Sequence, residues 1–346
     1  MMQKIDLHGI KPSNAKSVLS AISSREQTSR AEVAAVTGLS LMTVGKVVDL
    51  LLDAGVVLQE KETRMSAGRR AGLLTLNSRR YSVVLDLSES AFRMNIIDIT
   101  LSSVHTVTFR YNREFYYDEN LYLFLKQTKE YIDSHPELSD NYGIGITIPG
   151  MYISSDDKVA NSKIPELGLV PIRATAERIL ERPVSLIMKN VEAAAKSNIT
   201  LFPDYRDRVI IYMFMGESVD GALCDHGSFT KGAHEFECDF GRMILRFGET
   251  LEERIRASTN DYMMADELSS AVYNIITILD PDAFIIESDL PREPEIMTET
   301  IKESLLNYYK LPPERMPKFI TGGFGLRHCA RGVAMALREM WMDSIL

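Results

Sequence analysis

The stretch from residue 28 to residue 55 constrains the fold most, because it contains two helix starts around one tight turn. Ser29 precedes Glu32 by three residues, which is the spacing of a capping box at a helix N-terminus. Gly38 ends this helix, since glycine enters the left-handed conformation without steric cost, and Ser40 caps a second helix. The second helix has one apolar side at helical spacing, formed by Val44, Val47, Val48 and Leu51. The pattern predicts a helix-turn-helix unit.

A helix-turn-helix presents the N-terminal part of its second helix to the major groove of DNA. We therefore expect DNA contacts from the outward residues at this end, which are Ser40, Met42, Thr43, Gly45 and Lys46. An ordinary pair of core helices is the alternative. The turn, the caps and the outward side agree with one another, which favours DNA binding.

Two short apolar runs follow, at residues 56–58 and 73–76, and predict a two-stranded wing. The loop between them carries Arg64, Arg69 and Arg70. We expect these arginines to enter the minor groove, whose negative potential attracts such side chains. A solvated basic loop is the alternative.

Charge is distributed unevenly along the 346 residues, which are enough for two or three domains. Residues 1–80 hold 12 Lys and Arg against 7 Asp and Glu, whereas the remainder holds 27 against 41. A basic N-terminal module on an acidic body is typical of a protein that contacts DNA at one end only.

The three cysteines are too far apart in sequence to form a disulfide framework or a zinc cluster. No N-terminal signal pattern and no apolar run near 18 residues are present. We therefore expect a soluble, cytoplasmic protein with no membrane partner.

The rest of the chain reads as two similarly ordered α/β halves. The first half has strands at 82–87, 93–99, 104–110, 142–148 and 184–188, and helices at 118–134, 170–180 and 191–199. The second has a hairpin at 208–215 and 219–224, an irregular stretch to 248, strands at 283–287 and 318–321, and helices at 251–257, 263–279, 295–307 and 326–342. This order predicts an α/β fold in which a winged helix-turn-helix precedes a two-lobed, actin-like or ribonuclease-H-like ATPase body. We expect a DNA-binding domain over residues 1–80 and lobes over 81–200 and 201–346, with the last helix returning to the first lobe.

In this order the whole chain resembles the ROK family (repressor, open reading frame, kinase), in its transcriptional-regulator branch. Residues 29–55 match the DNA-binding pattern of the family, and residues 66–71 resemble its wing motif, S-x-G-G-R-P. Arg69 replaces a glycine of that motif and Ala71 replaces its proline.

The resemblance implies that the nucleotide site of the family has been lost. The phosphate loop D-x-G-G-T corresponds to DLSES at residues 86–90, and the loop G-T-G-I-G-G-G to GESVDG at 216–221. The glycine-rich adenosine site corresponds to ESD at 287–289. Each motif loses glycines that let backbone amides approach phosphates. We expect an acidic cleft that does not bind ATP, lined by Glu89, Glu217, Asp220, Glu287 and Asp289.

The catalytic base and the metal site of the family are also missing from the sequence. Val191 stands where the family's E-N-D-A-N run has its aspartate base, and valine cannot accept a proton. Glu192 is the next residue, but one step along a helix turns the side chain by about 100°, so we do not expect it to replace the base. We expect it to be an ordinary acid at the N-terminus of the helix, where the helix dipole favours it. No cysteine cluster follows Arg242, where the family binds zinc. We expect no enzymatic activity, no cofactor and no metal.

Part of a sugar pocket is retained by motif position. Asn161, Asn190, His234 and Asp239 match places where members of the family contact sugar hydroxyls, although Glu235 and Glu237 replace small residues nearby. Neutral amides with a carboxylate suit a polyol, because they pair hydroxyl groups in both directions.

The sequence thus predicts a DNA-binding transcriptional regulator, most simply a repressor, with a body that binds a sugar-like effector and forms a homodimer or larger homo-oligomer on a double-stranded operator. Two alternatives remain at this point: an active sugar kinase with an appended DNA-binding module, and a body that only dimerises.

Overall fold

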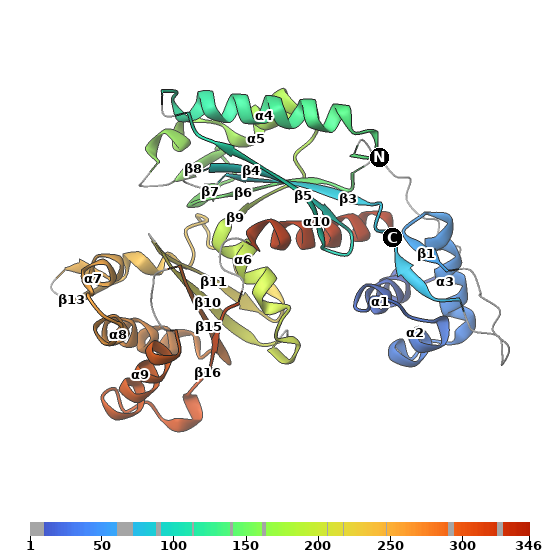
Figure 1. Cartoon of the computed structure of the whole chain (residues 1–346). Helices are drawn as coiled ribbons and strands as arrows, with labels where there is room; N and C mark the ends of the chain where they lie inside the picture. Colours follow the sequence, from blue (N-terminus) through green and yellow to red (C-terminus); the bar gives the residue numbers. More distant parts are fainter. Residues whose placement is uncertain are drawn as a thin grey trace.

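The computed structural model describes residues 10–60, 72–87, 91–112, 114–138, 141–160, 164–205, 207–216, 218–246, 248–289, 294–323 and 328–346. A small N-terminal domain lies beside a two-lobed body, and each lobe has its own central sheet (Figure 1).

The N-terminal domain packs helices against a small antiparallel sheet. Its described elements are α1 (Pro12–Ser23), α2 (Arg30–Thr37), α3 (Leu41–Asp53), β1 (Val57–Gln59) and β2 (Leu74–Leu76). A bridge between Thr28 and Leu74 joins the loop before α2 to this sheet. The three helices bury apolar side chains together, among them Val18, Leu19, Val33, Val47 and Leu51.

The first lobe is built on a sheet with the strand order β5-β4-β3-β6-β9. Its elements are β3 (Tyr81–Leu87), β4 (Ala91–Asp98), β5 (Ser103–Arg110), α4 (Tyr117–Ser134), β6 (Ile144–Ile148), β7 (Met151–Ile153), β8 (Lys158–Ala160), α5 (Ile172–Leu180) and β9 (Leu186–Lys189). β3, β4 and β5 pair antiparallel, whereas β6 and β9 run parallel to β3. Helical crossovers through α4 and α5 make the parallel pairing possible.

The second lobe repeats this arrangement with the order β12-β11-β10-β15-β16. Its elements are β10 (Val209–Met215), β11 (Val219–Asp225), β12 (Ser228–Phe229), β13 (Ile244–Arg246), β14 (Glu249–Thr250), α7 (Leu251–Ala257), α8 (Asp261–Leu279), β15 (Ala283–Ser288), α9 (Pro294–Asn307) and β16 (Lys318–Thr321). An antiparallel hairpin is again followed by parallel strands. The predicted fold class, two similarly ordered halves behind a winged helix-turn-helix, is confirmed.

Two helices lie between the sheets, α6 (Asn190–Ile199) and α10 (Cys329–Ile345) (Figure 1). α6 contacts β10 and β11 of the second lobe, while α10 packs on α6 and covers β3 and β6 of the first. The far end of α10 reaches the N-terminal domain, where Lys16 Nζ lies 2.8 Å from Asp343 Oδ1. The last helix therefore follows the final strand of the second lobe but packs on the first.

The expected irregular stretch before residue 248 contains the short strands β12 and β13, and the sequence analysis also missed the β7–β8 hairpin. These strands are two or three residues long, which is too short for a periodic pattern to be visible. Within the described part of the chain, no single helix has the length and apolar character needed to cross a membrane, and only the bent pair α2 and α3 passes that test jointly.

Candidate functional site

The connection between α2 and α3 has the geometry that the capping residues predict. Ser29 Oγ accepts a hydrogen bond from the Glu32 N–H at 3.3 Å, and Glu32 Oε2 accepts one from the Ser29 N–H at 2.7 Å. The backbone hydrogen bond from Ser29 is the main cause of a lowered pKa at Glu32. Gly38 ends α2 with φ at 68°. The chain bends by 119° between α2 and α3, which is within the range of helix-turn-helix units.

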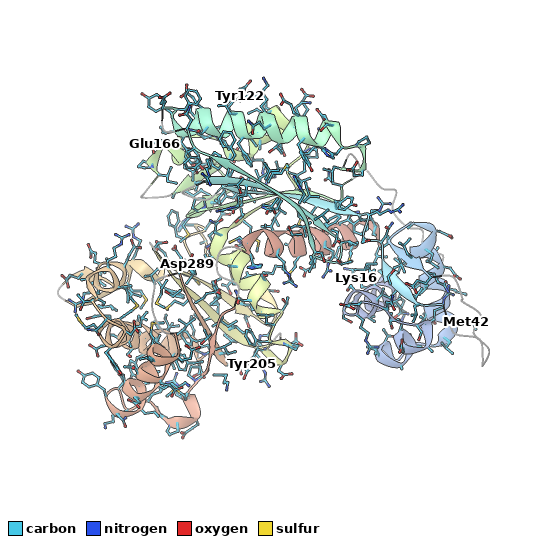
Figure 2. The ribbon with its side chains drawn as sticks, viewed as in Figure 1. Lys16, Met42, Tyr122, Glu166, Tyr205 and Asp289 are labelled. Atoms are coloured by element: carbon cyan, nitrogen blue, oxygen red, sulfur yellow. The ribbon has the colours of Figure 1, made fainter. Side chains whose placement is uncertain are left out.

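The N-terminal end of α3 faces outward, while its other side is buried. Ser40 Oγ accepts a hydrogen bond from the Thr43 N–H at 3.1 Å and so caps the helix. Met42 is 72% exposed and points away from the body (Figure 2). Lys46 is exposed and Gly45 is partly exposed on the same stretch. These residues, predicted as DNA contacts, therefore lie together at one end of one helix.

The wing is described only at its base. β1 and β2 pair with Leu58 opposite Thr75, as expected of a two-stranded wing. The predicted minor-groove residues Arg64, Arg69 and Arg70 lie outside the described residues.

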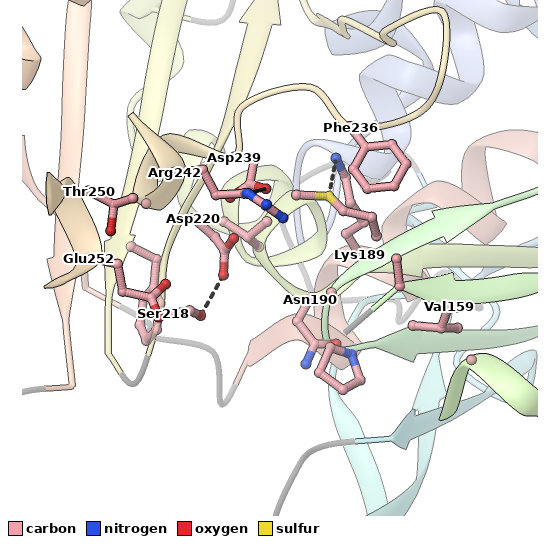
Figure 3. A pocket seen from close by; sticks show the side chains of 18 of the residues that line it. Val159, Lys189, Asn190, Ser218, Asp220, Phe236, Asp239, Arg242, Thr250 and Glu252 are labelled. Carbon is pink, nitrogen blue, oxygen red and sulfur yellow. Dashed lines mark hydrogen bonds and ion pairs between the residues drawn. The ribbon is translucent and has the colours of Figure 1, made fainter. Parts of the chain in front are cut away.

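A cavity of about 680 Å³ lies between the two lobes (Figure 3). Asn190 and Asp239, two of the predicted effector contacts, line it. Asn161 lies outside the described residues. His234 is exposed and lines a second pocket, which includes Ser154 and shares Phe236 with the first.

His234 therefore lines a different pocket from Asn190 and Asp239, its role in effector binding stays a prediction, and the contacts of Glu235 hold its segment there. The carboxylate of Glu235 accepts hydrogen bonds from the Ser154 N–H at 2.6 Å and from Ser154 Oγ at 2.8 Å. These bonds hold the segment around His234 against the β7–β8 turn.

The facing walls of the cavity differ in chemistry (Figure 3). The second lobe contributes charged groups of both signs, the carboxyl groups of Asp220, Asp239 and Glu252 and the guanidinium groups of Arg242 and Arg256. Burial, followed by the nearby charge of Asp220, raises the pKa of Asp239. On the other wall Thr147 Oγ1 donates to Asn190 Oδ1, so the amide N–H groups of Asn190 are the part able to donate to a ligand.

The position of the family's catalytic base is occupied by an apolar side chain. Val191 is 7% exposed and lines the cavity, and it has no group that takes a proton. Glu192, in the first turn of α6, is buried and pairs with Lys231 Nζ at 2.9 Å. It is therefore held by an ion pair in addition to its expected helix-terminal position.

Only part of the expected acidic lining is present among the described residues. Asp220 lines the cavity, but Glu287 is buried and does not, and Tyr212 Oη and Asn198 Nδ2 donate to its carboxylate at 2.7 and 2.9 Å. Asp289 is exposed and is not among the lining residues. Neither Glu287 nor Asp289 lines this cavity, so their place in an acidic nucleotide cleft stays a prediction. Glu89 and Glu217 lie outside the described residues.

The sequence analysis missed a buried ion pair at the cavity wall, formed by Lys189, which lines the cavity, and Glu237. Lys189 Nζ lies 2.6 Å from Glu237 Oε1, and the two side chains are 7% and 12% exposed. Burial raises the pKa of Glu237, but the hydrogen bonds from Lys189 and from the Gly232 N–H outweigh it and leave that pKa lowered. Two substitutions in the motifs could have indicated this ion pair. Lys189 replaces a glutamate of E-N-D-A-N, and Glu237 replaces a small residue, so one position gains a positive charge and the other a negative one.

In the described ranges, no group of three or more His, Cys, Asp and Glu side chains is arranged to hold a metal ion. The class that these features define is a winged-helix domain joined to a two-lobed, actin-like body with a cavity between the lobes.

Solved structures that share this fold include several ROK proteins. A ROK family transcriptional regulator, a homologue of the Escherichia coli MLC protein, aligns with a TM-score of 0.74 and 16% identity over 98% of both chains. A ROK family protein from Streptococcus pneumoniae in complex with sucrose aligns at 0.59 and 12%, over 75% of this chain and 98% of that one. A ROK family glucokinase from Streptomyces griseus, in complex with glucose and AMPPNP, aligns with a TM-score of 0.58 and 13% identity. The alignment covers 75% of this chain and 99% of that one.

By sequence, the chain is 23% identical to the N-acetyl-D-glucosamine kinase of Escherichia coli O127:H6 over 244 residues, which are 55% of this chain and 78% of that kinase. No protein-family profile matches the chain. The resemblance to the ROK family is thereby confirmed at the level of the fold, and the regulator matches the N-terminal domain as well as the body.

Proposed function

We propose that this chain is a ROK family transcriptional regulator, a repressor, with a DNA-binding domain over residues 1–80 and lobes over residues 81–200 and 201–346. The observation that carries the proposal is the capped, 119° turn between α2 and α3, which leaves the N-terminal end of α3 exposed on a basic segment. Such an end is what a helix-turn-helix inserts into the major groove.

The protein acts as a homodimer on a palindromic operator. Two-fold symmetry gives a second set of base contacts without any new recognition chemistry, which is why most regulators of this kind bind as dimers. A matching pair of half-sites in the bound DNA is the expected sign of this symmetry.

The effector is a sugar or sugar derivative that binds between the lobes. Amide and carboxyl groups at Asn190 and Asp239 in a cavity of about 680 Å³ support this assignment. So do the sucrose and glucose complexes of proteins with the same fold. The body needs no cofactor or metal for this role.

Selection of genomic fragments by the full-length chain tests the DNA-binding proposal. We expect a small set of fragments that share an inverted repeat, with an affinity that falls steeply as salt rises, because phosphate contacts release counterions. Lys46→Ala should weaken binding to all of these fragments and lower the salt slope by about one. Lys318→Ala, an exposed lysine on β16, is the matched control and should change neither. Retention of no fragments would contradict the proposal.

The alternative is an active sugar kinase, which the likeness to the N-acetyl-D-glucosamine kinase favours. ATP consumption with a panel of sugars that includes N-acetyl-D-glucosamine distinguishes the two. A regulator without a base at position 191 should consume ATP at the sugar-free rate, while one of the sugars should raise its melting temperature. Sugar-dependent turnover would establish the kinase, and no thermal shift with any sugar would favour a body that only dimerises.

A further inference from the structure

Two large apolar side chains are exposed to solvent at the N-terminal end of α3. Leu41 is 61% exposed and Met42 is 72% exposed. The core of the domain does not use them, because α3 packs through its other side, with Val44, Val47, Val48 and Leu51. The folding of the domain therefore does not depend on them, and they are available for contact with another molecule.

The hydroxyl groups next to them take part in the helix cap, which leaves one of the two O–H groups able to donate outward. Ser40 Oγ accepts from the Thr43 N–H at 3.1 Å, and it also lies 2.9 Å from Thr43 Oγ1. The hydroxyls of Ser40 and Thr43 are thus hydrogen-bonded to each other. Leu41 and Met42 are the large apolar side chains exposed at this end of α3.

The charges around this end are compatible with a nearby phosphate backbone. Lys46 is exposed one turn further along α3. The only acid in α3 that lies close to it, Asp49, has its carboxylate 2.8 Å from Arg30 Nη2. An ion pair here reduces the repulsion that an unpaired carboxylate would exert on DNA.

Resting on the DNA-binding function proposed above, we propose that Leu41 and Met42 read the C5 methyl groups of thymine in the operator. The thymine methyl is the apolar group that base edges present in the major groove, and the first residues of a recognition helix are those that reach base edges. Methionine suits this role because its unbranched, polarizable side chain adapts to irregular apolar surfaces. The operator half-site therefore carries thymines under the N-terminal end of α3.

Deoxyuridine substitution tests this readout with the full-length protein. Uracil pairs as thymine does and differs only in lacking the methyl group. In the operator obtained by genomic selection, each thymine is replaced singly by deoxyuridine and the dissociation constant is measured. One or two positions per half-site should lose about fourfold in affinity, the loss expected for one methyl group returned to water.

The variants link the methyl groups to the two side chains. Met42→Ala and Leu41→Ala should each bind thymine-containing operator more weakly, and at its own position each should no longer distinguish thymine from uracil. Lys46→Ala should weaken both DNAs equally and keep the thymine-to-uracil ratio of the wild type. Leu169→Ala, an apolar side chain in the body that is 83% exposed, is the matched control and should leave both affinities unchanged.

The outcomes separate this inference from the function on which it rests. Specific operator binding without any loss on uracil substitution overturns the methyl readout and leaves the regulator standing. A uracil effect that persists in both Leu41→Ala and Met42→Ala also overturns it. Failure to retain any DNA overturns the proposed function together with the readout.

Discussion

At the scale of single residues, burial decides what an acid near the cleft does. Asp220 lines the cavity, while the buried carboxylate of Glu287 accepts hydrogen bonds from Tyr212 and Asn198. Asp86, at the end of β3, is 8% exposed and forms an ion pair with Arg93 Nη1 at 3.0 Å. Burial raises the pKa of Asp86 from 3.8 to about 6, although Arg93 opposes the change.

This raised pKa predicts a pH dependence of stability that Asp86→Asn removes. Between pH 4 and pH 6 the unfolded chain ionises this group while the folded chain keeps it protonated, so the free energy of unfolding falls as pH rises. Above pH 6 the ionised Asp86 lowers the free energy of unfolding by about 3 kcal/mol, because a pKa change of one corresponds to about 1.4 kcal/mol. Urea unfolding of both proteins at several pH values measures the difference. A difference between wild type and variant that does not change from pH 4 to pH 7 would contradict this prediction.

At the scale of elements, two glycines in helices differ in whether the structure leaves room for a side chain. A Cβ added at Gly332 of α10 would lie 1.8 Å from the carbonyl oxygen of Ala193 in α6, so the helices approach closely only because this residue has no side chain. A Cβ added at Gly45 of α3 would meet only Arg30 Nη1, at an ordinary 3.8 Å.

The two glycines predict opposite effects of the same substitution. Gly332→Ala should lower the free energy of unfolding by about 1–3 kcal/mol or more, because α10 must move away from α6. Gly45→Ala should raise it by up to about 1 kcal/mol, since alanine favours the helix and fits in the space. Chemical denaturation of the full chain gives both values. Equal effects of the two substitutions would show that the α6–α10 contact tolerates a side chain.

At the scale of the whole molecule, one segment of the second lobe holds the first lobe through polar contacts. Glu237 binds Lys189 of β9, Lys231 binds Glu192 of α6, and Glu235 binds Ser154 after β7. The Lys189–Glu237 pair is the most buried of the three. It therefore carries the largest cost if only one partner is removed.

Replacing only one partner of the Lys189–Glu237 pair should destabilise the protein more than replacing both partners. Lys189→Met should lower the free energy of unfolding by about 3–5 kcal/mol, because Glu237 is left buried without its counter-charge. Adding Glu237→Gln should recover most of that loss. Lys158→Met, in an exposed pair with Asp156 at 3.8 Å, is the control and should cost less than about 1 kcal/mol. The prediction fails if the double variant is no more stable than Lys189→Met alone.

The sequence by itself determined the features that depend on residues within about one helical turn of each other. The Ser29–Glu32 capping box, the Gly38 stop and the Ser40 cap all join residues three or four apart, so their spacing is visible in the sequence. The order of strands and helices in the two halves was visible for the same reason, since apolar periodicity repeats along one element.

Only the tertiary structure decided which distant side chains meet. Lys189 and Glu237 are 48 residues apart, and Asn198 and Glu287 are 89 apart. Their contacts depend on how the lobes close and how deeply each group is buried, and no local pattern encodes either. The sequence analysis grouped Asn190, His234 and Asp239, whereas the structure places Asn190 and Asp239 at one cavity, His234 at a second pocket and Glu287 inside the fold. The spacing of residues determines single elements, whereas the packing between elements determines which charges are paired and which face a ligand.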